Sequence, residues 1–125
     1  MTDLRARTKT FAMRIIRLSS TLQRTTEAQV LGKQVLRSGT SVGAHYREAN
    51  RARSTTEFVS KLESGLQELD ETCYWLELLD ESGIVPRERL ADLIDEANQL
   101  TAILVTCVKN ARRRKDEVGR RKDEV

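Results

Sequence analysis

Proline, cysteine, histidine and aromatic residues are all scarce in this chain of 125 residues. A single proline, Pro86, leaves room for long helices, because proline interrupts a helix interior. With only Cys73 and Cys107, the chain lacks the disulfide framework of a small secreted scaffold, and we expect two buried thiols. The one histidine, His45, excludes the di-iron site of helical bundles, which needs Glu-x-x-His twice. We therefore predict no metal and no cofactor.

Long apolar runs are also missing. No stretch approaches the roughly 20 residues needed to cross a bilayer, so we expect no membrane contact. The N-terminal residues MTDLRARTKTF carry basic side chains without an apolar segment, and we expect no signal peptide. These absences favour a cytoplasmic protein. The few aromatic residues provide no series of stacking platforms for single strands, so nucleic acid is expected to bind through its backbone, if at all.

Apolar residues instead recur at the spacing of one helix face along most of the chain. Phe11, Ile15, Leu18 and Leu22 follow one another at intervals of three or four residues. The three later stripes contain Leu31, Val35, Val42 and Ala49; then Phe58, Leu62, Leu66, Leu69, Cys73 and Leu76; then Leu90, Leu93, Ile94, Ala97, Leu104 and Val108. No alternating strand pattern occurs. The sequence predicts an all-α, up-down-up-down four-helix bundle.

Helix boundaries are indicated by polar residues and glycine. A side-chain oxygen at the start of a helix accepts hydrogen bonds from amides of the first turn, and glycine often closes the end. The expected signals are Asp3 for the first helix, Thr26 with Gln29 for the second, Ser54 with Glu57 for the third, and Gly83 followed by Pro86 in the first turn of the fourth.

The end of the chain repeats itself. The segment RRKDEVGRRKDEV is a literal duplication around Gly119, with both charge signs and no large core residue. It is too short to be a structural repeat. We therefore divide the chain into a four-helix bundle over residues 1–115 and a disordered charged tail over residues 116–125.

The net charge of +3 conceals an uneven distribution. Residues 1–53 hold eleven Lys and Arg against three acids, a net charge of +8. Residues 54–111 hold four against twelve, a net charge of −8, and residues 112–125 add +3. The first two helices are thus expected to be basic and the last two acidic.

This asymmetry has three compatible interpretations. A basic surface binds phosphate, because clustered Lys and Arg release counterions from nucleic acid. Alternatively, the basic face of one subunit meets the acidic face of the next, in a heterologous contact that closes into a ring. The third interpretation is neutralisation within one bundle by ordinary surface ion pairs, each worth under about 1 kcal/mol.

The segment QVLRSGTSVGAHYREANRARS places small residues in the middle of the second predicted helix. Each glycine there costs about 1 kcal/mol relative to alanine, and we interpret the small residues as a close helix contact. Ser41, His45 and Glu48 are spaced to share one helix face, as a hydrolase would need. A mid-helix serine lacks the strained turn and oxyanion hole of a nucleophile, however. We predict that the protein is not an enzyme.

Several separated motifs resemble one family of bacterial proteins. They are RSGTSVGA-x-YREANRARS, EFVSKL and DETCYWLELL between Gln34 and Leu79, followed by EANQLTAILVTCVKNAR. In this order they resemble the four-helix-bundle proteins encoded in intervening sequences of 23S ribosomal RNA genes, over roughly residues 5–114. The family usually has asparagine where this chain has His45, and a bulkier, titratable ring there is expected to cost stability if that asparagine makes a buried hydrogen bond.

The resemblance implies a small bundle assembled into a ring, a homopentamer. The family is also similar to the accessory protein of diversity-generating retroelements, a basic ring that binds a reverse transcriptase and nucleic acid. What the resemblance implies is therefore a non-enzymatic, oligomeric accessory protein that binds the phosphate backbone of RNA or DNA. The alternative is a protein-interaction scaffold whose basic and acidic faces serve ring assembly only.

Two sets of candidate residues follow from the charge pattern and the resemblance. The set expected to contact phosphate is Arg37, Arg47, Arg51, Arg53, Arg112, Arg113, Arg114 and Lys115. The set expected at a helix or subunit contact is Ser38, Gly39, Ser41, Gly43, His45 and Glu48.

Overall fold

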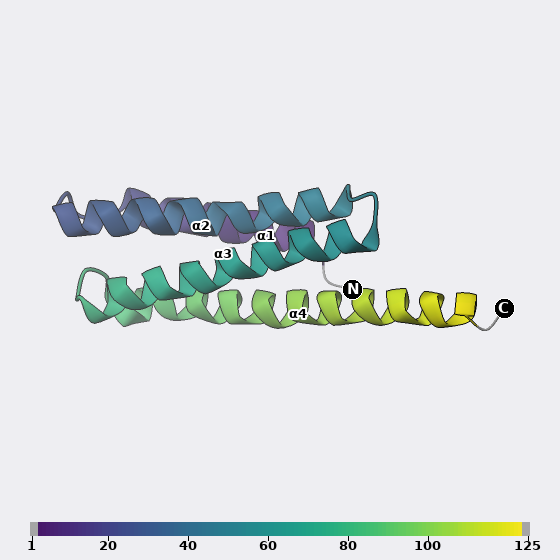
Figure 1. The fold of residues 1–125 in the computed structure, drawn as a ribbon. Coiled ribbons are helices and arrows are strands. Elements are labelled where there is room, and N and C mark those ends of the chain that lie inside the picture. Colours follow the sequence, from purple (N-terminus) through teal and green to yellow (C-terminus); the bar gives the residue numbers. More distant parts are fainter. Residues whose placement is uncertain (1–2, 124–125) are drawn as a thin grey trace.

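The computed structural model describes residues 3–123, with side chains described as far as Arg120. Four helices follow one another: α1 (Leu4–Ser20), α2 (Thr26–Asn50), α3 (Thr55–Glu81) and α4 (Arg87–Asp123). They run alternately in opposite directions as a bundle in which α1 packs on α2, α2 on α3 and α3 on α4 (Figure 1). The predicted all-α four-helix bundle is confirmed. None of the helices in this part of the chain is long and apolar enough to cross a membrane.

The helix ends use most of the predicted capping residues. The Asp3 carboxylate accepts a hydrogen bond from the Ala6 amide at 3.1 Å, and the Ser54 hydroxyl accepts one from the Glu57 amide at 3.0 Å. Gly83 follows α3 with a φ of 77°, a conformation that side-chain-bearing residues rarely adopt. Pro86 lies directly before the first residue of α4 rather than within its first turn.

The predicted cap of α2 was wrong by one residue. Thr25, not Thr26, precedes the helix with an extended backbone, and its hydroxyl accepts from the Ala28 amide at 3.2 Å. Gln29 does not complete a capping box, because its side-chain amide donates to the Gln23 carbonyl at 2.8 Å. The capping-box spacing favoured Thr26, but the extended backbone at Thr25 places the cap one residue earlier.

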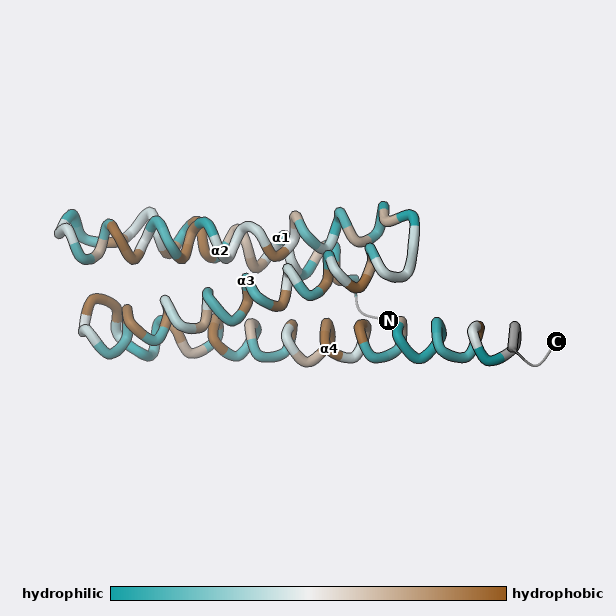
Figure 2. Tube along the Cα trace, viewed as in Figure 1, coloured by the Kyte–Doolittle hydropathy of each residue, from teal (hydrophilic) through white to brown (hydrophobic). Residues whose placement is uncertain are grey.

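The core lies along the bundle axis, where each helix turns its apolar face inward (Figure 2). Its largest fully buried side chains include Phe11, Ile15, Leu62, Leu69 and Leu104, all predicted from their spacing. The prediction missed Val59, Thr72, Leu79 and Leu100, which are also buried. Leu22, Leu31, Phe58, Leu66, Cys73 and Ile94 are only partly buried, at the edge of the core. Spacing thus located each inward face but not its width.

The two cysteines are also at the edge of the core. Cys73 and Cys107 are free thiols and each is partly exposed, so the expectation of two buried thiols was wrong. Burial, with a smaller effect from the charge of Asp70, raises the pKa of the Cys73 thiol. The thiol is therefore protonated, and less nucleophilic than a thiolate, at neutral pH.

The last helix extends past the rest of the bundle (Figure 1). Residues 116–123 continue α4 without a break, so these residues of the expected disordered tail are helical. Oppositely charged residues four apart, such as Arg112 and Asp116, favour this conformation. Side chains from residue 112 to residue 120 are all exposed. The domain boundary between residues 115 and 116 stays a prediction, and residues 124–125 lie outside the described residues.

Candidate nucleic-acid interface

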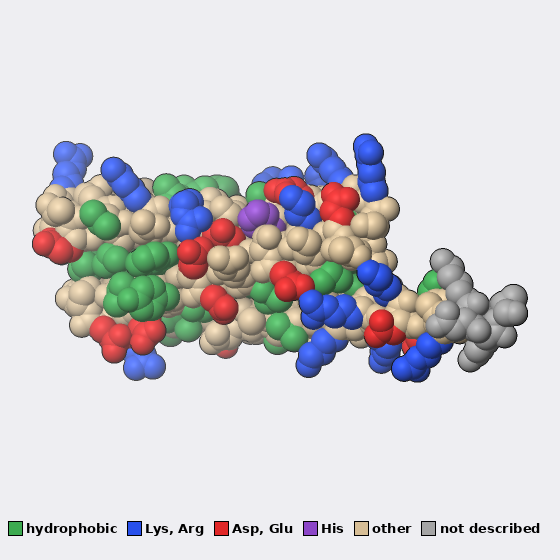
Figure 3. All heavy atoms as spheres, in the orientation of Figure 1, with side chains coloured by type: hydrophobic (Ala, Val, Ile, Leu, Met, Phe, Trp, Pro, Cys, Tyr) green, Lys and Arg blue, Asp and Glu red, His purple; other side chains and the backbone are tan. Residues whose placement is uncertain are grey.

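Cations from two distant parts of the sequence meet at one end of the bundle. The turn between α2 and α3 carries Arg51 and Arg53, both exposed. Lys115 of α4 donates from Nζ to Thr56 Oγ1 at 2.6 Å, which brings α4 beside the start of α3. Figure 3 shows Lys and Arg side chains over this end of the molecule. The predicted phosphate-contacting residues that belong to this basic end are Arg47, Arg51, Arg53, Arg112, Arg113, Arg114 and Lys115.

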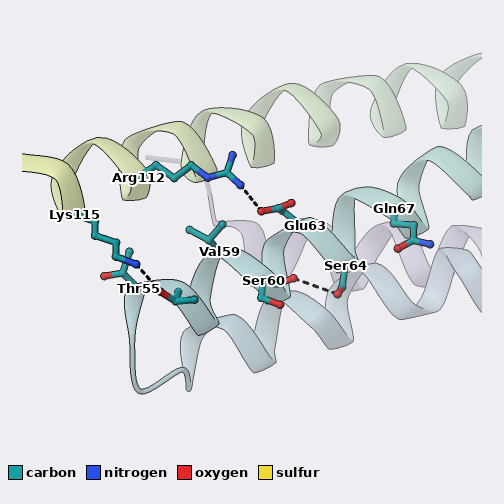
Figure 4. A pocket seen from close by; sticks show the side chains of 9 residues that line it. Thr55, Val59, Ser60, Glu63, Ser64, Gln67, Arg112 and Lys115 are labelled. Carbon is teal, nitrogen blue, oxygen red and sulfur yellow. Dashed lines mark hydrogen bonds and ion pairs between the residues drawn. The ribbon is translucent and has the colours of Figure 1, made fainter.

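A pocket of about 540 Å³ opens within the basic end, between α3 and α4 (Figure 4). Arg112 and Lys115 line it from α4. From α3 the lining residues are Thr55, Thr56, Val59, Ser60, Glu63, Ser64 and Gln67. Hydroxyl groups and cations of this kind are the side chains that bind phosphate oxygens and position a protein on nucleic acid.

The pocket also contains one carboxylate. Arg112 Nη2 lies 2.6 Å from Glu63 Oε1, and about half of each of these side chains is exposed. An ion pair this exposed is weak, because water screens it. Arg112 can therefore exchange Glu63 for a phosphate at little cost.

Arg37 lies apart from the basic end, halfway along α2. Its guanidinium donates to Glu68 at 3.1 Å and to Glu71 at 3.1 Å on α3. These two carboxylates raise the pKa of Arg37 and engage its two terminal nitrogens. The structure thus places Arg37 in a link between two helices, as the interpretation of internal neutralisation expects, and separates it from the other seven candidates.

The small residues of α2 lie where its neighbours approach. A Cβ atom on Gly39 would come within 2.7 Å of Ile15 Cγ1, and one on Gly43 within 3.1 Å of Thr8 Oγ1, both on α1. On the other side, the buried hydroxyls of Ser38 and Thr72 share a hydrogen bond of 2.8 Å between α2 and α3. These residues hold three helices together, and their part in a subunit contact stays a prediction.

His45 lies on the side of α2 that packs against α3. Its Nδ1 atom is buried and makes no hydrogen bond among the described residues; the nearest acidic oxygen, Glu48 Oε1, is 3.7 Å away. Lys61 Nζ lies 2.7 Å from the other Glu48 oxygen, and this hydrogen bond lowers the pKa of Glu48. An unpaired buried nitrogen costs stability. The cost expected for histidine in place of the family's asparagine stays a prediction.

Ser41, His45 and Glu48 do not form the geometry of a hydrolase. The Ser41 hydroxyl donates to the Arg37 carbonyl at 2.6 Å, so its proton is directed along its own helix rather than toward His45. In the described part of the chain, His, Cys, Asp and Glu form no cluster of three or more that could hold a metal ion. The predictions of no enzymatic activity, no cofactor and no metal stay predictions.

Sequence reasoning missed the α3 side of the pocket. Thr56, Ser60 and Ser64 recur every four residues, which places three hydroxyls on one face of α3. That spacing is visible in the sequence, but only the fold shows that Arg112 and Lys115 face it. Lys61, the partner of Glu48, was likewise not identified, because pairs between helices depend on their register.

Comparison with known proteins identifies the family. The model of the family described as 23S rRNA-intervening sequence protein matches residues 2–106. The chain belongs to this family. Its motifs between Gln34 and Leu79 lie on α2 and α3, so the resemblance to the intervening-sequence proteins is confirmed at the level of the family.

A solved relative agrees with this assignment. It is the crystal structure of a protein with unknown function from the S23 ribosomal protein family of Bacteroides thetaiotaomicron VPI-5482. The two proteins are 36% identical and superpose with a TM-score of 0.81, over 86% of this chain and 99% of the relative. A search of the curated proteins finds no match.

Proposed function

We propose that this protein is a non-enzymatic, oligomeric accessory protein that binds the phosphate backbone of nucleic acid through the basic end of its bundle. The observation that carries the proposal is the hydrogen bond from Lys115 to Thr56, which holds the cations of residues 112–115 beside the start of α3, directly after the exposed Arg51 and Arg53. Arg112, Arg113, Arg114 and Lys115 are all exposed, and exposed cations gain affinity by releasing condensed counterions from nucleic acid.

The proposal includes partners and a location. The resemblance to the accessory protein of diversity-generating retroelements supports an assembly of copies of this chain, a homopentamer, that works beside a reverse transcriptase on RNA or DNA. Few aromatic side chains are exposed, which favours backbone contacts over base stacking. The action of such a complex on nucleic acid would take place in the cytoplasm.

The experiment is a titration of a structured RNA duplex at several salt concentrations. Each phosphate neutralised by a cation contributes about −0.9 to the slope of log K against log salt for B-form DNA, and we expect a similar contribution for an RNA duplex. The Arg53→Gln/Arg113→Gln double variant removes two exposed cations from the basic end. We expect weaker binding at low salt and a slope that is shallower by about 2.

A matched control removes the same charge elsewhere. Arg24→Gln/Lys33→Gln changes two exposed cations at the opposite end of the bundle, near the α1–α2 turn. The control should bind RNA almost as well as the unmodified protein. Equal losses in the two double variants would show binding by net charge rather than by the basic end, and no RNA binding at low salt would contradict the proposal.

A scaffold without nucleic-acid binding is the second candidate. It is favoured by the separation of charge between α1, which holds five Lys and Arg and no acid, and α3, which holds eight acids and one lysine, because oppositely charged helices of two copies attract each other. If the protein is a scaffold, the same titration should show no RNA binding by the unmodified protein or by either double variant, even at low salt. The protein should nevertheless be oligomeric.

A further inference from the structure

Two outward faces of the bundle carry apolar side chains that none of the described residues covers. On α1, Met13 is 42% exposed and Ile16 is 41% exposed. On α3, Tyr74 is 52% exposed, and its ring lies against Trp75, with ring centroids 5.1 Å apart. Large apolar side chains that remain exposed side by side commonly mark an interface.

The apolar face of α3 continues onto α2. Val30 is 54% exposed on α2. The contacts of Glu48 with Lys61 and of Ser38 with Thr72 fix an antiparallel register, in which Val30 lies level with the last turns of α3. Figure 3 shows hydrophobic side chains gathered over this part of α2 and α3, with acidic side chains at its margin.

The charges around the two faces are opposite in sign. α1 holds five Lys and Arg and no acidic residue, and Lys9 and Arg17 are exposed one turn on either side of Met13. α3 holds eight acids and a single lysine, and Asp70 and Glu77 are exposed beside Tyr74. A basic rim on one face and an acidic rim on the other attract each other and fix which faces meet.

The two faces belong to helices at diagonal corners of the bundle. α2 contacts α1 and α3, whereas α1 and α3 make no contact with each other over the described residues. Their outward faces therefore point away from each other, and one molecule cannot pair its own two faces. Two copies can join the α1 face of one to the α3 face of the other, which is a heterologous contact.

The two faces also lie at the same height along the bundle. Ile15 on α1 approaches Gly39 on α2, and the neighbouring Ser38 is bonded to Thr72 on α3. Ile16 is thus level with the α3 residues just before Tyr74. A contact between faces at equal height adds little translation along the axis, which favours a closed ring over an open filament.

We infer that the α1 face of each subunit, centred on Met13 and Ile16, binds the α3 face of the next copy of this chain, centred on Tyr74 and Trp75. The inference rests on the oligomeric part of the proposed function and names its surfaces. The apolar side chains form the centre of the contact and the charged residues its rim, in the usual arrangement of an interface that buries about 800 Å² per partner.

The test uses two variants of the full chain, Ile16→Glu and Tyr74→Glu, with solution mass measured by light scattering and folding checked by circular dichroism. Each variant loses one of the two faces and keeps the other. Alone, each should have the mass of a monomer. Mixed in equal amounts they should form a dimer, because the intact α3 face of the first meets the intact α1 face of the second.

Val118→Glu is the matched control. Val118 is 51% exposed on the protruding end of α4, away from both faces, and this variant should keep the mass of the unmodified protein. Retention of that mass by Ile16→Glu or Tyr74→Glu overturns the inference, and so does a mixture that remains monomeric.

Failure of the interface is distinguishable from failure of the proposed function. If the unmodified protein is oligomeric and both variants keep its full mass, the oligomer forms through other surfaces and the inferred interface is wrong. A monomeric unmodified protein rejects the oligomer and the interface together. In either case the salt dependence of RNA binding separately decides the role of the basic end.

Discussion

At the scale of single residues, Gly39 on α2 and Gly65 on α3 differ in how much space their neighbours leave for a side chain. A Cβ atom at Gly39 would overlap Ile15, a fully buried side chain that cannot swing away, whereas the nearest atoms to a Cβ at Gly65 are 3.8 Å away. The two glycines therefore have the same helix propensity, but they differ in whether packing requires a residue without a side chain. Only the first is required by packing.

Replacement of each glycine by alanine should separate these roles. Gly39→Ala gains about 1 kcal/mol in helix propensity but overpacks the contact with Ile15 at a cost of roughly 1–3 kcal/mol, so we expect a net loss of stability. Gly65→Ala has room for the methyl group and should be neutral or stabilising by up to about 1 kcal/mol. Urea denaturation measures both. Equal stability of the two variants would contradict the close contact between α1 and α2.

The pair of Glu48 and Lys61 predicts a pH dependence. The hydrogen bond from Lys61 lowers the pKa of Glu48 from 4.5, so the ionised carboxylate favours the folded state. That contribution is fully present above pH 4.5 and disappears as the pH falls through the lowered pKa. The unmodified protein should therefore have a slightly higher Tm than Glu48→Gln at pH 7, and the difference should vanish in acid. A difference that persists at pH 2, or grows there, would contradict the ion pair.

At the scale of helices, the caps determine where each element begins. Thr25 accepts the hydrogen bond from Ala28, while Thr26 is already within α2. Thr25→Ala should cost about 1 kcal/mol of stability, because it leaves an amide of the first turn without its partner. Thr26→Ala, the adjacent control, should cost much less. Thermal unfolding of the two variants measures these losses of stability. A larger loss from Thr26→Ala would show that Thr26 caps the helix, as first predicted from the sequence.

The helices themselves were predictable, because hydrophobic spacing reports directly on which side of a helix is buried. Phe11, Ile15, Leu62 and Leu69 were identified in this way and are fully buried. The candidate site was predictable only in part. Charge along the sequence indicated residues 112–115, but the hydroxyl groups of α3 that face them depend on how the helices are aligned, which spacing within one helix does not encode.

Arg37 illustrates the same limit. In the sequence it is one more arginine on a basic helix, and it was grouped with the phosphate-contacting residues. In the structure Glu68 and Glu71 engage its guanidinium from a different helix. A count of charges along the chain cannot distinguish such a paired cation from a free one.

At the scale of the whole molecule, the fold separates two kinds of surface. The basic end combines the α2–α3 turn with α4, whereas the exposed apolar faces lie on α1 and α3 along the sides of the bundle. Assembly through the sides would leave the basic ends of all subunits accessible and near one another. Several weak phosphate contacts would then act together, which raises the overall affinity.

The most direct test of this account is the solution mass of the unmodified protein, measured by light scattering with and without a structured RNA at low and high salt. In the absence of RNA, the assembled protein should have a mass several times that of the 14.3 kDa chain. With RNA the mass should increase at low salt and not at high salt, because the phosphate contacts are screened. A 14.3 kDa monomer whose mass does not change with RNA at low salt would contradict it.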